Sequence, residues 1–176
     1  WASRKMCMNK DPIFPVVNLG NSQYSVNKPL VATKFFKCWW MMGRARTQLN
    51  FTYASSLSSL TCVYPDNMSD ANAAVTRRFI FRDFEIIDYT QSRNKIGIDL
   101  PCIYGGLGEN LTMTYFNYAA LNRFNMQTKF ERCFQEACIN GLIYDQGNWT
   151  GSTAETTVNN NSSLVDNRFH ASGGSN

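Results

Sequence analysis

The sequence predicts a mostly β (α+β) domain: an antiparallel β-barrel or sandwich with one C-terminal helix, stapled by disulfide bonds. The chain has 176 residues, of which 44% are hydrophobic, enough for one sizeable core. Charged residues make up only 17% and aromatic residues 14%, a balance that favours strands with a surface of Asn, Ser and Thr. Six widely spaced cysteines are typical of a disulfide framework.

The strands are predicted from runs of apolar and alternating residues. Residues 1–30 contain three prolines and indicate an extended N-terminal arm. An apolar stretch over 34–42 and the alternation of Leu49, Phe51 and Tyr53 predict the first strands, and residues 60–64, 96–100 and 111–121 predict three more. Residues 77–89 are rich in aromatic and β-branched side chains, but they alternate poorly.

One helix is predicted over residues 128–141. Thr128 and Glu131 form a capping box, and Gly141 stands where a left-handed C-terminal cap is expected. Five apolar residues fall at helical spacing on one face: Phe130, Cys133, Phe134, Ala137 and Cys138. Residues 142–144 predict a final strand, which completes a single domain over 1–150. Residues 151–176 offer little to bury and predict a polar, flexible tail.

The cysteines are expected to form disulfides rather than a metal site. They are Cys7, Cys38, Cys62, Cys102, Cys133 and Cys138. The single histidine, His170, lies in the tail, so neither a metal nor a cofactor is expected. Residues five apart on a helix have Cα atoms about 8 Å apart, too far for a bridge. Cys133 and Cys138 are therefore expected to tie the helix to the β body and not to each other.

N-glycosylation signals place the chain in the secretory pathway. Six triplets fit the N-x-S/T pattern, at Asn50, Asn67, Asn110, Asn148, Asn160 and Asn161. The chain begins at Trp1 without a signal-peptide pattern, so we expect a processed N-terminus. No apolar run is long enough to span a bilayer, and no transmembrane segment is expected. The predicted location is secreted or on the cell surface.

Residues typical of catalysis are scarce, and the chain is not expected to be an enzyme. It has no G-x-S-x-G, H-E-x-x-H or P-loop motif. Asp83 and Glu85 lie two apart on one face of a predicted strand, where they form either a carboxylate pair or, as we favour, a solvated surface. The net charge of +4 is too mild to indicate a nucleic-acid partner.

Basic residues cluster in two parts of the chain, and two interpretations of them stay open. The cluster consists of Arg44, Arg46, Arg77, Arg78, Arg82 and Arg93. These arginines either keep the surface soluble, which we favour, or contact a small anionic ligand.

Residues around Trp39 carry a family resemblance. Asn27, the run Lys-Phe-Phe-Lys-Cys-Trp-Trp at 34–40 and Gly43 together resemble the first signature of the lipocalins, and Arg123 resembles the arginine of their third. The resemblance implies that Trp39 and Arg123 are structural, at the floor of an antiparallel barrel. It also implies that the barrel holds a small apolar or amphipathic ligand.

Two functions follow as expectations, both without catalysis. The chain is either a secreted carrier of a small hydrophobic ligand or a surface domain that binds a protein receptor. The spread of glycosylation signals along the chain favours, for the second, a viral or parasite envelope protein exposed to a host.

Overall fold

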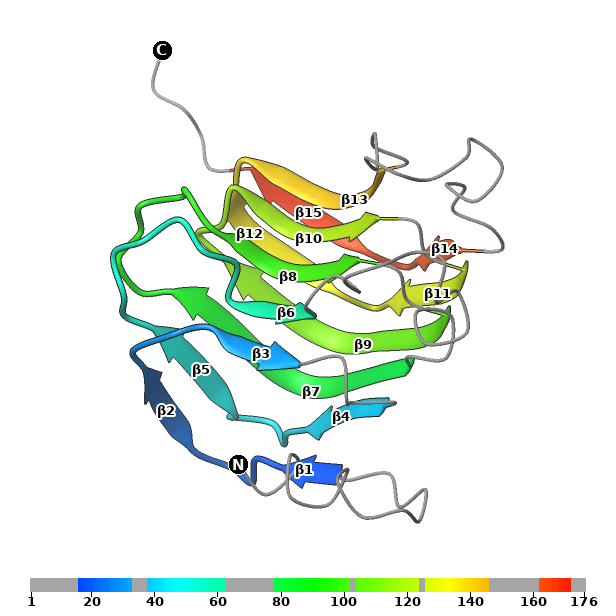
Figure 1. The fold of residues 1–176 in the computed structure, drawn as a ribbon, viewed down its shortest axis with the longest axis horizontal. Coiled ribbons are helices and arrows are strands. Elements are labelled where there is room, and N and C mark those ends of the chain that lie inside the picture. The colour runs from blue at the N-terminus through cyan, green and yellow to red at the C-terminus, as the bar shows by residue number, and fades with distance from the viewer. Residues whose placement is uncertain are drawn as a thin grey trace.

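The structure, a computed structural model, describes residues 16–32, 38–62, 78–101, 104–123, 126–145 and 162–171. These residues form parallel β-strands that stack along one axis in chain order, from β1 and β2 at one end to β13, β14 and β15 at the other (Figure 1). The strands are β1 (Val16–Asn18), β2 (Gln23–Val26), β3 (Leu30–Ala32), β4 (Cys38–Met42), β5 (Gln48–Phe51), β6 (Leu60–Cys62), β7 (Arg78–Asp88), β8 (Ile96–Pro101), β9 (Tyr104–Thr114), β10 (Tyr118–Arg123), β11 (Met126–Glu131), β12 (Phe134–Cys138), β13 (Asn140–Asp145), β14 (Ser163–Val165) and β15 (Arg168–Ala171).

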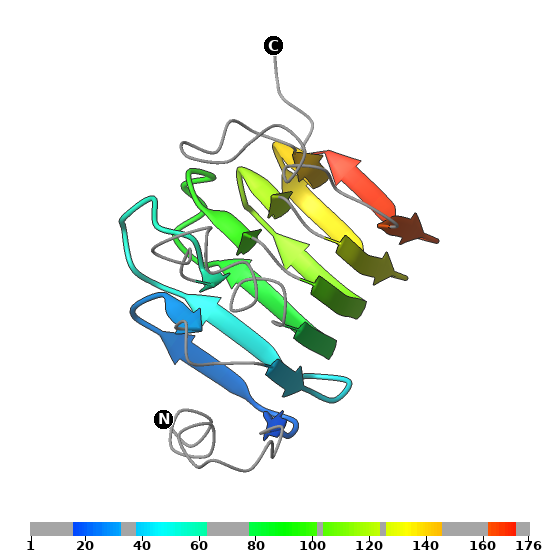
Figure 2. The same ribbon diagram turned by 45° about the vertical axis from the view of Figure 1, so that its right-hand side comes forward.

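Two sheets face each other, and the chain passes from sheet A to sheet B in each of the first five turns of a solenoid. Sheet A has ten strands and sheet B has five, in the order β13-β10-β8-β6-β3. We number the turns as coils 1 to 6, one for each described segment of the chain. Sheet A bends within each coil (Figure 2). In coils 3 and 4 a single strand, β7 or β9, continues through the bend. In coils 2 and 5 two separate strands lie on its two sides, β4 and β5 in coil 2 and β11 and β12 in coil 5. The architecture is a parallel β-solenoid.

The prediction of an antiparallel barrel or sandwich is therefore wrong, although the mostly β character is confirmed. Every strand pair in the described part of the chain is parallel. Parallel pairing follows from the connection: each strand pairs with its equivalent one coil later, which runs in the same direction. The antiparallel barrel that the lipocalin resemblance implies is absent from the described residues, while the resemblance itself stays a prediction.

The bend in sheet A is made by one residue with a left-handed backbone in each of three coils. Asp83, Asn110 and Arg132 have φ of 60°, 51° and 51°, and they follow residues that pair in register, Arg82, Glu109 and Glu131. Each bend inserts one residue into the alternation of the strand. In β7 the buried residues are Phe79 and Phe81 before the bend and Phe84, Ile86 and Asp88 after it. The poor alternation of residues 77–89 in the sequence has this cause.

The prediction of a C-terminal helix is also wrong, and left-handed residues within strands again explain the misleading sequence pattern. No helix occurs in the described part of the chain, so none there is long and apolar enough to cross a membrane. Residues 128–141 belong to β11, β12 and the start of β13. Left-handed residues at Arg132 and Ala137 stretch the period-2 pattern, so that buried Phe130, Cys133 and Cys138 fall at helix-like spacing.

Buried aromatic rings pack against one another in the interior between the sheets. Phe79, Phe81, Phe84, Phe116 and Phe130 are all buried. In coil 4 two glycines leave room for neighbouring rings: a Cβ on Gly106 would lie 2.1 Å from the Phe79 ring, and one on Gly108 would lie 2.5 Å from the Phe130 ring. Through that gap Phe79 and Phe130, two coils apart, meet with centroids 5.7 Å apart.

Strands occur at both ends of the chain, within the predicted N-terminal arm and within the predicted tail. Described residues of the predicted N-terminal arm form β1, β2 and the start of β3, and residues of the predicted tail form β14 and β15, which pair with β11 and β12. β1, β2, β14 and β15 add the first and last layers of sheet A, and β3 adds an edge strand of sheet B.

Candidate functional site: a polar groove at the bend of sheet A

A loop in coil 2 overhangs the bend of sheet A. Five residues, 43–47, separate the in-register pairs Met42–Arg82 and Gln48–Glu85, whereas coil 3 has only two residues there. The loop is anchored at both ends: the Gly43 amide donates to the Arg82 carbonyl at 2.9 Å, and the Glu85 amide donates to the Thr47 carbonyl at 2.9 Å. The middle of the loop is left to project from the sheet.

Two residues of this loop, Gly43 and Thr47, show why its sequence is suited to the position. A Cβ on Gly43 would lie 2.4 Å from the Asp83 carbonyl oxygen, so the close approach of the two coils requires glycine. The Thr47 hydroxyl accepts from the Arg44 amide at 2.7 Å and donates to the Gly20 carbonyl. Arg44, Ala45 and Arg46 are exposed.

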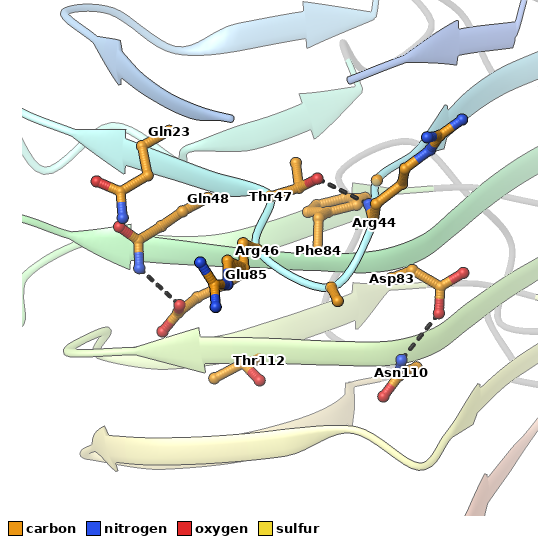
Figure 3. A pocket seen from close by; sticks show the side chains of 12 residues that line it. Gln23, Arg44, Arg46, Thr47, Gln48, Asp83, Phe84, Glu85, Asn110 and Thr112 are labelled. Atoms are coloured by element: carbon orange, nitrogen blue, oxygen red, sulfur yellow. Dashed lines mark hydrogen bonds between the residues drawn. The ribbon is translucent and has the colours of Figure 1, made fainter. Parts of the chain in front are cut away.

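Below the loop lies a groove of about 630 Å³ with a polar floor (Figure 3). Gln23, Gln48, Glu85 and Thr112 pair in register across coils 1 to 4 and form one row of this floor. Neighbouring strands lie about 4.8 Å apart, so the row presents amide, carboxylate and hydroxyl groups at a regular spacing. Asp83 and Asn110, at the bend, form a second row.

Neutral donors hold both carboxylates of the floor. Glu85 accepts from the Gln48 side-chain amide at 2.7 Å and from the Thr114 hydroxyl at 3.4 Å. Asp83 accepts from the Asn110 side-chain amide at 2.8 Å (Figure 3). The sequence placed Asp83 and Glu85 on one face, and the structure brings both to the same groove. Each carboxylate keeps acceptor capacity for a donor on a ligand.

The predicted arginine cluster is divided between different surfaces. Arg44 and Arg46 line the groove and make no ion pair with another described residue. Arg82 pairs with Glu109 at 2.7 Å in a separate charged network that also includes Arg132. Arg78 lies at a second hollow, of about 500 Å³. Arg93 lies over the Tyr115 ring at 5.9 Å, and Arg77 is outside the described residues.

A second polar cluster lies inside the molecule, where coil 3 turns from sheet A to sheet B. Lys95 and Asp88 are completely buried, and the Lys95 ammonium donates to Asp88 at 2.7 Å. It also donates to the Thr90 hydroxyl at 2.9 Å and to the Ser92 hydroxyl at 3.3 Å. The ammonium lies 5.1 Å from the centre of the Tyr53 ring, which adds a cation–π contact.

The environment shifts the pKa values of both acidic groups beside Lys95. Burial acts to raise the pKa of Asp88, but hydrogen bonds outweigh it, that from Lys95 first and then those from the two hydroxyls, so the pKa lies below its ordinary value. Burial raises the pKa of the Tyr53 phenol, and the nearby charge of Asp88 adds to the shift.

Two of the six cysteines have described side chains, and both are buried free thiols. No disulfide involves Cys133 or Cys138 among the described residues, and the expected disulfide framework stays a prediction. Each sulfur lies within hydrogen-bond distance of backbone carbonyl oxygens, Cys133 of Glu131 at 3.4 Å and Cys138 of Met113 at 3.3 Å. Burial raises the pKa of each thiol to about 11, so both are poor nucleophiles.

The other four cysteines give no information on disulfides. Cys38 and Cys62 lie in β4 and β6, and their side chains are not described, while Cys7 and Cys102 lie outside the described residues. The described residues contain no group of His, Cys, Asp and Glu that could hold a metal.

The remaining predicted residues lie in three settings. Trp39 is buried and packs edge-to-face on Phe81, with centroids 5.0 Å apart. Arg123 ends β10, and its side chain is not described. Asn110 is exposed in the groove, whereas Asn50 on β5 is half-buried and its side-chain oxygen has no hydrogen-bond partner. Asn67, Asn148, Asn160 and Asn161 lie outside the described residues.

Sequence reasoning missed most of the groove floor. Gln23, Gln48 and Thr112 are unremarkable in the sequence because they are 25 to 89 residues apart from one another, and only the register of coils 1 to 4 aligns them. Comparison with family models, with curated proteins and with solved structures finds no match to this chain.

Proposed function

We propose that this chain is a non-catalytic binding domain of the extracellular space whose binding surface is the groove below the 43–47 loop. The observation that carries the proposal is the pair of exposed arginines, Arg44 and Arg46, at a groove whose floor is rich in hydrogen-bonding groups. The extracellular location rests on the N-glycosylation signals of the sequence.

The groove favours a polar, anionic ligand over the apolar ligand expected from the sequence. An apolar carrier requires a cavity in the interior, whereas the described residues between the two sheets include buried phenylalanine rings in mutual contact. Glu85 and Asp83 favour ligand hydroxyl or amine donors, and the guanidinium groups favour a carboxylate, sulfate or phosphate. An acidic oligosaccharide carries both kinds of group, hydroxyls and carboxylates, along one chain.

Binding to a protein receptor is the second candidate. It is favoured by the position of the 43–47 loop, which projects from the sheet with two arginines, a residue type enriched at protein interfaces. An acidic, glycan-free patch on a host protein would present the same carboxylates to Arg44 and Arg46. This candidate includes the viral or parasite surface domain expected from the sequence.

Calorimetric titration with an oligomer of galacturonic acid, against a neutral glucose oligomer of equal length, tests the proposal. We expect the acidic oligomer to bind and the neutral one to bind more weakly. The double variant R44A/R46A is expected to weaken binding of the acidic oligomer by about ten- to a hundredfold, because it removes two charge-assisted contacts. Added salt is expected to weaken binding by the wild type and to have less effect on the double variant.

The matched control is R78A, which removes an exposed arginine outside the groove and is expected to bind as the wild type does. Equal losses in R78A and R44A/R46A would show a diffuse charge effect and contradict the proposed site. Binding of neither oligomer would contradict the acidic saccharide and leave the receptor candidate to be tested with the same variants.

A further inference from the structure

Exposed apolar side chains gather at the two ends of the solenoid. Nine large hydrophobic residues are exposed among those that the structure describes, and seven of them lie in or beside the terminal strands. These are Val16, Tyr24 and Val31 at the N-terminal end, and Ile139, Ile143, Leu164 and Phe169 at the C-terminal end. Only Leu57 and Tyr89 lie elsewhere.

The terminal strands also have unpaired edges. In the described residues β1 and β2 pair only with coil 2, and β14 and β15 pair only with coil 5. With no further partner strand among the described residues, the backbone N–H and C=O groups on the outer side of each edge can bind another parallel strand. A partner must run in the same direction as the edge strand to continue this ladder.

The two ends match each other along the same rows of the core. One row runs in register from Tyr24 through Leu49, Ile86, Met113 and Gln135 to Phe169. Its middle members are buried, but Tyr24 is 39% exposed and Phe169 is 49% exposed. The row therefore begins and ends with an aromatic ring that lacks cover on one side.

A second row has the same form. It runs from Val17 through Met41, Phe81, Gly108 and Phe130 to Leu164, which is 46% exposed. Val17, at its other end, is only partly buried. If one molecule stacks on another in register, the residues at the opposite ends of each row come into contact.

We infer that this chain binds a second copy of itself head to tail, with β1 and β2 of one molecule continuing sheet A on β14 and β15 of the next. The two ends of the solenoid are complementary to each other, so the partner is a second copy of the chain. Its strands run in the required direction. In-register stacking places Tyr24 of one molecule on Phe169 of the other, and Val17 on Leu164. Parallel pairing and burial of aromatic and aliphatic side chains stabilise the contact. Because the contact is between unlike surfaces, it extends into chains of molecules.

Two variants that each block one end test this inference. Tyr24→Lys places a charge at the N-terminal end, and Phe169→Lys places one at the C-terminal end; both positions are partly exposed, so the folded monomer tolerates lysine. The molar mass in solution is measured by light scattering over roughly a hundredfold range of concentration. Tyr89→Lys is the matched control, since Tyr89 is 65% exposed and lies away from both ends.

The wild type and Y89K are expected to grow in mass with concentration, and Y24K and F169K are each expected to remain monomeric. An equimolar mixture of Y24K and F169K is expected to form a dimer and nothing larger, because only one intact end of each kind can meet. A monomeric wild type at every concentration would overturn the inference. Monomers in the mixture, or dimers of either variant alone, would overturn the head-to-tail geometry.

Discussion

Two polar clusters of this molecule use similar residue types in opposite ways. The cluster around Lys95 is closed: its ammonium has a carboxylate, two hydroxyls and an aromatic ring within reach, and it has no exposed surface. The groove at the bend of sheet A is open, with arginines that pair with no described carboxylate and carboxylates held by neutral amides. A satisfied charge inside the solenoid is part of the scaffold, whereas unsatisfied charges at a hollow on its outside are available to a ligand.

The largest effect is expected from opening the closed cluster. Lys95→Met leaves Asp88 buried without its cation, and we expect a loss of about 3–5 kcal/mol in the free energy of unfolding. Chemical denaturation measures the loss. The double variant D88L/K95M removes both charges and is expected to lose less than K95M alone. A K95M protein as stable as the wild type would show that the cluster contributes nothing to the scaffold.

The second-largest effect is expected from acid, which lowers the stability that the closed cluster contributes to the folded protein. The pKa of Asp88 is lower in the folded than in the unfolded protein, so its contribution to stability is complete above the unfolded pKa of about 3.9. This contribution is lost as the pH falls through the folded pKa. Thermal unfolding between about pH 6 and pH 2 measures the change. The Asp88→Asn variant, already less stable, is expected to show a smaller acid-dependent loss; an identical loss would assign the effect to other carboxylates.

Glycosylation is expected to distinguish the groove from the rest of sheet A. Asn110 is exposed at the groove, so a glycan there covers the binding surface, and we expect about tenfold weaker binding of the acidic oligomer by the glycosylated protein. Thr112→Val removes the glycosylation signal and keeps Asn110. Wild type and T112V are compared after production in a glycosylating and in a non-glycosylating host. The wild type alone is expected to differ between hosts.

The same comparison separates the glycan from the side chain of Thr112, because T112V lacks a glycan in both hosts. An equal affinity of wild type from both hosts, with Asn110 occupancy confirmed by mass spectrometry of glycopeptides, would contradict the placement of the ligand beside Asn110. Occupancy at Asn50 is expected to be lower than at Asn110, because Asn50 is half-buried on β5.

The smallest effect is expected from the groove arginines on stability. R44A/R46A changes two exposed side chains that pair with no described carboxylate, so the free energy of unfolding is expected to change by less than about 0.5 kcal/mol. Chemical denaturation of R44A/R46A and of K95M compares the contributions of the open groove and the closed cluster to the free energy of unfolding. A loss comparable to that of K95M would place the arginines in the scaffold.

Composition and local alternation predicted the strand content, and nothing in them specified how the strands pair. The 22-residue spacing between Gly106 and Thr128, or between Ala120 and Leu142, is the signal of a solenoid. It is hidden because coils 2 and 3 are longer: Phe79 pairs with Gly106, 27 residues on, and Trp40 with Ile80, 40 residues on. A repeat of unequal length escapes a search for fixed periods.

The bends of sheet A and the composition of the groove could not be predicted from the sequence. The bends at Asp83, Asn110 and Arg132 are single left-handed residues and lack the Gly and Pro that mark most turns. From the sequence, Asp83 and Glu85 could be predicted to share one surface, and the arginines could be identified as possible contacts for an anionic ligand. It could not bring Arg44 and Arg46 to Glu85, because that proximity depends on the register between coils 2 and 3.

Hydrogen–deuterium exchange with and without the galacturonic acid oligomer tests the central claim, that the open groove is the binding surface, most directly. Backbone amides of residues 43–48, 83–85 and 110–112 are expected to exchange more slowly with the oligomer bound, and those around Asp88 and Lys95 are expected to be unchanged. Protection confined to other surfaces, or protection that persists in R44A/R46A, would contradict the account.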